Sequence, residues 1–287
     1  FLYFCFNHGT SFSSGSTAQP PFSYPSRIKL TLAILYTAII SMALVGNILV
    51  IYILYKRPET RRLTSFMYVN LAVADLLVTA VVMPQSMELI ILDNLWIDGT
   101  FGELLAKLIM FVFFVAVTAS VFSLTAVAFD FFFGIVLPMQ KFPRLGNKKI
   151  LVPTIWITSM CLMTPWLITI KVKNSRIELK FTQFGETQAA LRGIFLYIVV
   201  TIYLLPRVTM CSLYGHVCHT LHRDKLPLPS TIAQQLGPML PSVKLRSIAV
   251  VVAFALCWLP AHAYHMILAI DFSVRESLPY NFVLLCY

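Results

Sequence analysis

Residues 103–137, with the sequence ELLAKLIMFVFFVAVTASVFSLTAVAFDFFFGIVL, form the longest apolar stretch of this chain. After Lys107, Asp130 is the only charged residue in the stretch. A helix needs about 20 mostly apolar residues to cross a bilayer whose hydrocarbon core is about 30 Å thick. The stretch meets that requirement, so it predicts a membrane-spanning helix.

The rest of the chain repeats this pattern. Hydrophobic residues make up 58% of the sequence and charged residues only 12%. An ordinary soluble domain carries roughly twice that charged fraction. We therefore expect an all-α, integral membrane bundle of seven helices. The predicted helices span about 28–55, 65–92, 103–137, 149–170, 192–221, 245–270 and 277–287.

The two ends of the chain differ from the central membrane blocks. Residues 1–27 include a run rich in Ser, Thr and Pro, and we expect them to form a disordered extracellular tail before the membrane domain at 28–287. The last block, 277–287, supplies only about 16 Å of helix. We therefore expect the seventh helix to be truncated and the chain to be a fragment.

The loops between the blocks carry an uneven charge. Loops 56–64, 139–149 and 222–246 together hold twelve Lys and Arg residues but only two acids, Glu59 and Asp224. By the positive-inside rule these loops are cytoplasmic, which predicts an extracellular N-terminus in a multi-pass protein of the plasma membrane. The net charge of +10 therefore reflects topology. It indicates contact with membrane lipid and no nucleic-acid partner.

Several motifs occur in successive predicted helices. They are GNILVIYIL (46–54), NLAVADLL (70–77), the single Trp156 of the fourth helix, LLP with LYG (204–206 and 213–215) and FALCWLP (254–260). In this order they resemble the class A, rhodopsin-like G-protein-coupled receptors, over about residues 30–285. The details are most similar to neuropeptide receptors of the galanin, neuropeptide Y and orexin kind. The resemblance implies an extracellular peptide ligand and a heterotrimeric G protein as partners.

One motif departs from the family pattern. Family members usually carry Asp-Arg-Tyr at the end of the third helix, where this chain has Asp130, Phe131 and Phe132. In the family the Arg pairs with the Asp at rest and contacts the G protein in the active state. A phenyl ring has no hydrogen-bond donors, whereas a guanidinium has five. The substitution therefore calls G-protein coupling into question.

A second departure concerns the outer surface. Family members usually join the third helix to the second extracellular loop by a disulfide. The helix position is Ala106 here, and the loop at 171–191 contains no Cys. We expect no disulfide here. The loop should therefore be freer, because it lacks the roughly 2–4 kcal/mol of stabilisation that such a bond contributes.

Asp75 is a charged residue in the middle of the second block. A charge there costs about 2.5–3.5 kcal/mol on insertion scales, which makes it a candidate functional residue. By resemblance it binds sodium together with Ser120, in a pocket that includes Asn47 and Trp258. The alternative is a structural carboxylate that is hydrogen-bonded to water and Asn47.

The resemblance also implies an outer ligand cavity and an inner switch. Phe113 occupies the place of the Asp that binds an ammonium group in receptors for monoamines, so we do not expect a monoamine ligand. The candidate ligand contacts are Gln85, Phe113, Trp258, His262 and His265. The two histidines are three residues apart, which fits a metal pair or polar groups of a cavity. The candidate switch residues are Val121, Asp130, Phe131, Pro206, Tyr214 and Phe254, although aromatic residues in such positions are also ordinary core.

Other functions find less support. A degenerate or non-signalling receptor fragment is the first alternative. A channel or transporter would need a series of charges along a path, and only Asp75 and Arg207 lie deep within blocks. We do not expect an enzyme, because the chain has no HExxH or GxSxG motif and no paired carboxylates on one helix.

Overall fold

The computed structural model describes residues 25–56, 63–92, 95–137, 147–173, 175–179, 193 and 196–222, with scattered residues between 249 and 270. Its elements, in chain order, are α2 (Ser26–Lys56), α3 (Leu63–Leu77), η2 (Val78–Val82), α4 (Met83–Ile91), α5 (Gly99–Ile135), α6 (Lys148–Met163), α7 (Trp166–Thr169), β1 (Ile170–Lys173), β2 (Arg176–Leu179), η4 (Val199–Leu204) and α9 (Leu205–His222). The described part of the protein is therefore mainly helical, with one antiparallel β-hairpin.

Five helices in this described part are long and apolar enough to cross a membrane. They are Ser26–Lys56, Leu63–Ile91, Gly99–Ile135, Lys149–Thr169 and Leu196–Thr220. The tail up to residue 24, the loop after His222 and the predicted seventh helix at 277–287 lie outside the described residues. In the sixth block, the scattered residues that are described are helical.

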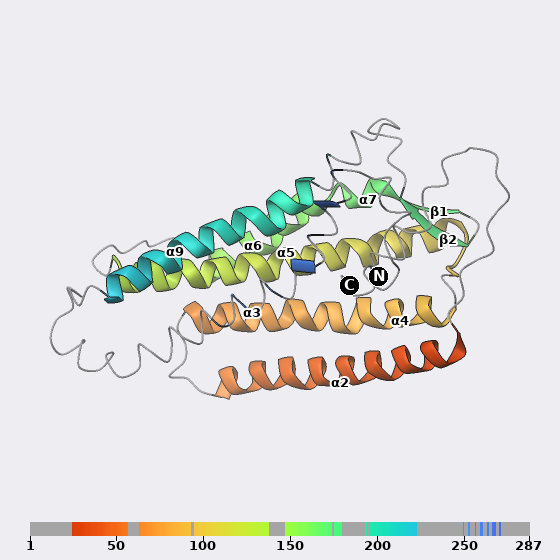
Figure 1. Ribbon diagram of the computed structural model, residues 1–287, viewed down its shortest axis with the longest axis horizontal. Coiled ribbons are helices and arrows are strands. Elements are labelled where there is room, and N and C mark those ends of the chain that lie inside the picture. Colours follow the sequence, from red (N-terminus) through yellow and green to blue (C-terminus); the bar gives the residue numbers. More distant parts are fainter. Residues whose placement is uncertain are drawn as a thin grey trace.

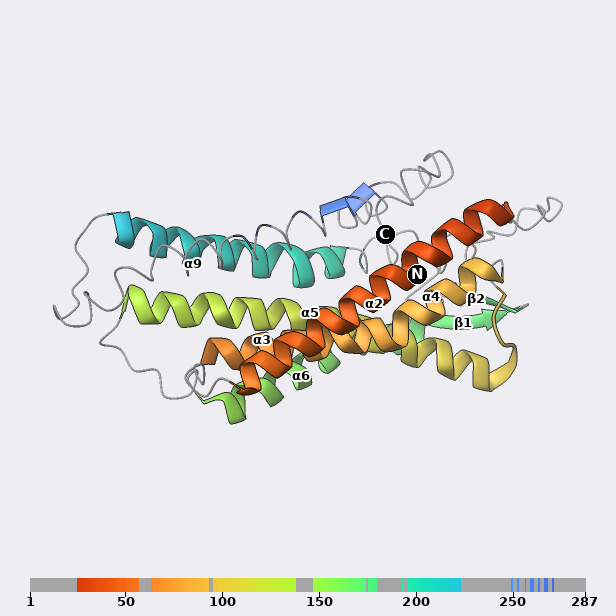
Figure 2. The same cartoon turned by 90° about the horizontal axis from the view of Figure 1, so that it is seen from below.

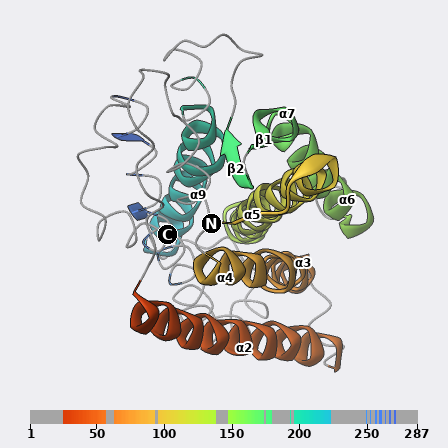
Figure 3. The same ribbon diagram turned by 90° about the vertical axis from the view of Figure 1, so that its right-hand side faces the viewer.

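The long helices run side by side in an elongated bundle (Figure 1). Viewed along the bundle, α5 lies between α3 and α4 on one side and α6 and α9 on the other, and α2 is outermost (Figure 3). We call the end that holds Thr64 and Asp130 the inner end and the end that holds the hairpin the outer end.

Burial follows this arrangement. Seventeen residues of α5 are buried, whereas α2 has no buried residue within the described structure. The apolar residues of α5 are distributed all round its axis, which is typical of a helix at the centre of a membrane bundle. On α2, large apolar side chains such as Leu30 and Met42 are 64% and 68% exposed, as expected for a helix in lipid.

Two helices contain wide π-helical turns next to a proline. The segment η2 directly precedes Met83 and Pro84, and η4 directly precedes Leu205 and Pro206. A proline removes a backbone donor and crowds the preceding turn, so a local change in helical pitch beside it is expected. Such π turns change the direction in which the following residues face, which includes Gln85 on α4.

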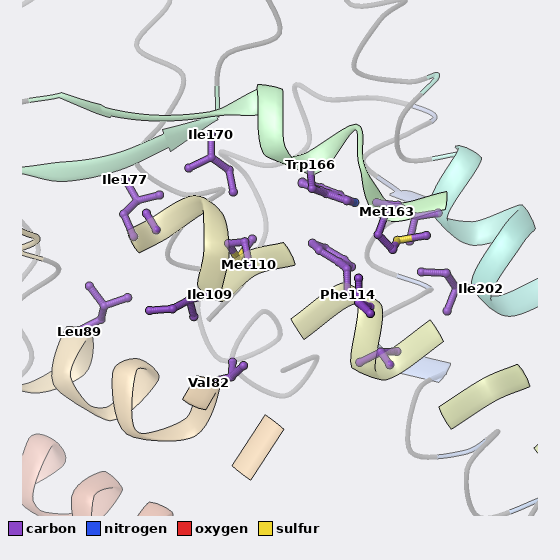
Figure 4. Close-up of a cluster of buried hydrophobic side chains, with 14 of the residues drawn as sticks. Val82, Leu89, Ile109, Met110, Phe114, Met163, Trp166, Ile170, Ile177 and Ile202 are labelled. Atoms are coloured by element: carbon purple, nitrogen blue, oxygen red, sulfur yellow. The ribbon is translucent and has the colours of Figure 1, made fainter. Parts of the chain in front are cut away.

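The outer half of the bundle has a continuous apolar core, which we call the outer cluster. Figure 4 shows side chains from α4, α5, α7, the hairpin and η4 meeting there. Phe114 stacks on Trp166, with ring centroids 4.2 Å apart and planes inclined by 12°. Ile170 and Ile177 attach the hairpin to this cluster, since they are 0% and 6% exposed. The core therefore fixes the hairpin against the outer end of α5.

Candidate functional site

The outer half holds two of the predicted ligand contacts. Gln85 on α4 is 6% exposed, and neither atom of its amide group has a hydrogen-bond partner among the described residues. Phe113 on α5 packs against the outer cluster and meets Phe114 edge-on, at 5.2 Å between ring centroids. The other predicted contacts, Trp258, His262 and His265, lie outside the described residues.

The middle of the bundle holds the predicted sodium residues. The carboxylate of Asp75 on α3 lies near the hydroxyl of Ser120 on α5. Asn47 of α2 donates to the carbonyl of Ala43 in its own helix, at 2.9 Å. The structure therefore brings together one carboxylate and one hydroxyl from two helices, which is the oxygen chemistry that a hard cation prefers. Trp258, the further predicted member of this pocket, is outside the described residues.

A buried polar network lies between the sodium residues and the inner end. The amide of Asn70 donates to the hydroxyl of Ser123 at 2.8 Å, and its oxygen accepts from the indole of Trp156 at 2.8 Å. This network joins α3, α5 and α6. Sequence reasoning singled out Trp156 but missed Asn70 and Ser123. The sequence does contain one indication of this network, because Asn70 is a polar residue within an apolar block.

At the inner end, Asp130 has a partner other than an arginine. The hydroxyl of Thr64, on α3, donates to the carboxylate of Asp130. Phe131 packs against an inner apolar cluster that includes Met67 and Val127. The lost ion pair inferred from the sequence is thus replaced, in this structure, by a hydrogen bond between α3 and α5.

Aromatic contacts connect this end of α5 to α9, which lies beside it in both side views (Figures 1 and 2). The rings of Phe131 and Tyr214 are 6.5 Å apart, and Phe132 meets His216 edge-on at 6.0 Å. The other predicted switch residues are separated from this contact. Val121 and Pro206 are buried nearer the middle of the bundle, and Phe254 lies outside the described residues.

Arg207 is a buried cation on α9. It is 8% exposed, and its guanidinium carbon lies 4.6 Å from the centre of the Tyr203 ring. A guanidinium over an aromatic face gains a cation–π attraction, which partly offsets the cost of its burial. A charge at this depth in a membrane is costly unless it faces the bundle or a partner, and the low exposure of Arg207 places it inside the bundle.

Comparison with known proteins decides the family. The model of the "7 transmembrane receptor (rhodopsin family)" matches residues 46–287 of this chain, which is most of its length. The chain belongs to the rhodopsin family of receptors. The prediction of a rhodopsin-like, seven-helix membrane receptor is therefore confirmed.

Individual relatives refine this result. The receptor is 29% identical over 260 residues to a "QRFP-like peptide receptor" of Branchiostoma floridae, covering 85% of this chain and 67% of the relative. It is 30% identical over 267 residues to the "Substance-K receptor" of Homo sapiens, covering 88% and 64%. It is 31% identical over 256 residues to the "Neuromedin-K receptor" of Cavia porcellus, covering 87% and 56%.

These relatives are named as receptors for peptides, in agreement with the predicted neuropeptide type. The receptor chain spans between about half and two thirds of the length of such relatives; its alignment covers 67% of one and 52% of another. At the inner end of the receptor, Phe131 stands where the resemblance implies an arginine. Its ring contacts the ring of Tyr214 on α9.

Proposed function

We propose that this receptor binds an extracellular peptide in the outer half of its bundle and activates a heterotrimeric G protein weakly or not at all. The observation that carries the first part is the similarity to peptide receptors along 85–88% of the chain. The second part rests on Phe131 and its aromatic contact with Tyr214. Both observations support a receptor function rather than an enzymatic one.

The proposed setting is the plasma membrane, with the N-terminus outside the cell. Twelve basic residues in the three loops on the side of the inner end support this orientation. The hairpin then faces the extracellular medium, and the contact between Phe131 and Tyr214 faces the cytoplasm.

Gln85 is the described residue best suited to recognise a peptide. Its amide offers two donors and one acceptor oxygen, which match the acceptor and donor of a peptide bond. Its amide is buried and has no hydrogen-bond partner among the described residues. A buried polar group without a partner costs free energy, so a ligand group that hydrogen-bonds to this amide would remove that cost. Together with Phe113, and with Trp258, His262 and His265, it forms the proposed contact set.

The first prediction concerns Gln85. A full-length receptor displayed on cells should bind at least one of the peptides for which its relatives are named, tested as a panel of QRFP-like peptide, substance K, substance P and neuromedin K. Gln85→Leu should weaken that binding about 5- to 150-fold, the cost of leaving one or two polar ligand groups unpaired.

Ser86→Ala is the matched control for this prediction. The Ser86 side chain is equally buried, but its hydroxyl donates to the carbonyl of Val82 in the same helix, so its loss should leave peptide binding unchanged. Equal binding by the native receptor and Gln85→Leu would remove Gln85 from the site. Binding of none of the four peptides, with surface display verified, would count against a ligand of this class.

We further propose that Asp75 and Ser120 bind a sodium ion that favours the inactive packing. A ligand that prefers one conformation shifts the equilibrium toward it, and such couplings usually change affinity 5- to 150-fold. Sodium should therefore lower agonist affinity by about tenfold in the native receptor. Asp75→Asn should abolish this dependence, and Ser120→Ala should reduce it.

The control for the sodium prediction is Thr118→Ala, two residues from Ser120 on α5. Its buried hydroxyl donates to the carbonyl of Phe114 in the same helix, so this change should preserve the response to sodium. A sodium response that persists in Asp75→Asn would leave Asp75 with the structural role of the alternative reading.

A further inference from the structure

The β-hairpin at the outer end is tied to the receptor by polar contacts as well as by its apolar side chains. Strands β1 and β2 pair antiparallel, with Ile170 opposite Leu179 and Lys173 opposite Arg176. The hairpin lies along the outer end of α5 (Figure 1). At the start of β1, Ile170 packs into the outer cluster. The turn of the hairpin lies further along the chain and is held by other contacts.

These other contacts are made by Ser175, which lies in the turn. Its backbone N–H donates to Oδ1 of Asp98 at 2.6 Å, and its hydroxyl donates to Oδ2 of the same carboxylate. Its carbonyl accepts from the backbone N–H of Trp96 at 2.8 Å. Every polar group of Ser175 is therefore used by the short segment before α5. We call these contacts the clasp.

The segment that receives the clasp is itself fixed. The indole of Trp96 donates to the carbonyl of Gly102 at 2.8 Å, which folds the segment back on the first turns of α5. A Cβ atom at position 102 would lie 1.8 Å from the carbonyl oxygen of Ile97, so this close approach requires a glycine. Asp98 is thus presented to the hairpin by a rigid support.

A second polar link joins β1 directly to α5. The ammonium of Lys171 lies 3.1 Å from Oε1 of Glu103, which also pairs with Lys107 at 2.6 Å within α5. Glu103 is three residues before Ala106, which is fully buried and occupies the helix position of the family's usual disulfide. The described cysteines, Cys161, Cys211 and Cys218, are free, and residues 171–191 contain no cysteine.

We propose that the Asp98–Ser175 clasp and the Glu103–Lys171 pair form a reversible, non-covalent tether that holds the hairpin over the outer end of the bundle. The tether is electrostatic, so it should weaken as the ionic strength rises and should be insensitive to reductants. The two hydrogen bonds from Ser175 hold the pKa of Asp98 below its ordinary value, so the carboxylate stays charged at neutral pH. This proposal predicts an ordered hairpin, whereas the missing disulfide alone predicted a freer loop.

Hydrogen–deuterium exchange of the amides of residues 170–179, in the purified full chain, tests this proposal. Asp98→Ala removes both acceptors and should raise exchange at these amides by about tenfold or more, since local opening then costs less. Ser175→Gly tolerates the φ of 54° at this position and removes only the hydroxyl, so it should give a smaller increase. Asp98→Asn keeps one acceptor oxygen and should restore part of the protection.

The second link has a matched pair of variants at one carboxylate. Lys171→Ala and Lys107→Ala each remove one partner of Glu103, but only Lys171 belongs to the hairpin. Lys171→Ala should therefore raise exchange at 170–173, and Lys107→Ala should not. Salt at about 1 M, where the screening length is about 3 Å, should act in the same direction as Lys171→Ala.

Two outcomes would overturn the tether. Exchange at 170–179 that is unchanged in both Asp98→Ala and Lys171→Ala would show that the apolar contacts of Ile170 and Ile177 hold the hairpin alone. A marked increase with dithiothreitol would show that a disulfide holds it. The proposal requires protection that resists reduction and is lost on removal of Asp98.

Discussion

A full-length receptor with Phe131→Arg and Phe132→Tyr should show agonist-driven nucleotide exchange on a G protein about 30- to several-thousand-fold more efficiently than the native sequence. Losing a hydrogen-bonded charge from an interface costs about 2–5 kcal/mol, which corresponds to this range in affinity. Restoring the charge should restore this affinity for the G protein. The measurement is the rate of nucleotide exchange at limiting G-protein concentration, with receptor number matched.

The structure explains why both positions are changed together. Phe131 packs into the inner cluster and faces Tyr214, and Phe132 contacts His216, so both rings contribute to the seam between α5 and α9. An arginine at 131 would exchange one of these apolar contacts for five donors. Tyrosine at 132 retains a ring for the contact with His216.

Two controls separate this effect from its alternatives. Phe133→Arg adds the same charge two residues further along the helix, where it lies on a different face, and should not raise exchange. Thr64→Ala releases Asp130 from its hydrogen bond without adding a donor and should not raise exchange either. A native receptor that already couples as well as the double variant would show that the arginine is dispensable in this protein.

Asn70→Ala should lower the free energy of unfolding by roughly 2–4 kcal/mol, because the partly buried indole of Trp156 loses its acceptor and the buried Ser123 loses a donor. The thermal midpoint of the purified receptor should fall by about 5–10 °C. Ser159→Ala is the matched control on α6, since this fully buried hydroxyl donates to Ile155 in its own helix. It should shift the midpoint little.

A double-mutant cycle distinguishes the network from simple loss of packing. Asn70→Leu combined with Trp156→Phe removes both hydrogen-bonding groups and should cost clearly less than the sum of the single changes, because neither partner is left unsatisfied. Additive losses would mean that the two side chains contribute to stability independently, and the network would then have no energetic role.

The sequence was sufficient for the parts of the fold that depend on local composition. Long apolar runs predicted membrane helices in the regions that α2, α5 and α9 occupy, since the bilayer requires every backbone polar group to be paired within its own helix. These features need no knowledge of how distant segments pack.

The features that the sequence did not predict depend on contacts between distant residues. Thr64 and Asp130 are 66 positions apart, and Asn70 and Trp156 are 86 apart. Nothing in the local pattern indicates that such residues meet. The π turns at 78–82 and 199–204 were also missed, because their prolines predict a disturbance but not its geometry. The clasp was missed because Ser175 and Asp98 look like ordinary loop residues.

We propose that the aromatic contact of Phe131 separates ligand binding at the outer end from G-protein coupling at the inner end. The affinity of a peptide agonist for the full-length receptor, measured in the presence and absence of G protein, tests this proposal. The native affinity should stay unchanged, whereas the affinity of the variant with Phe131→Arg and Phe132→Tyr should rise by about tenfold with G protein and fall back on adding a GTP analogue. An equal rise for the native receptor would contradict the claim.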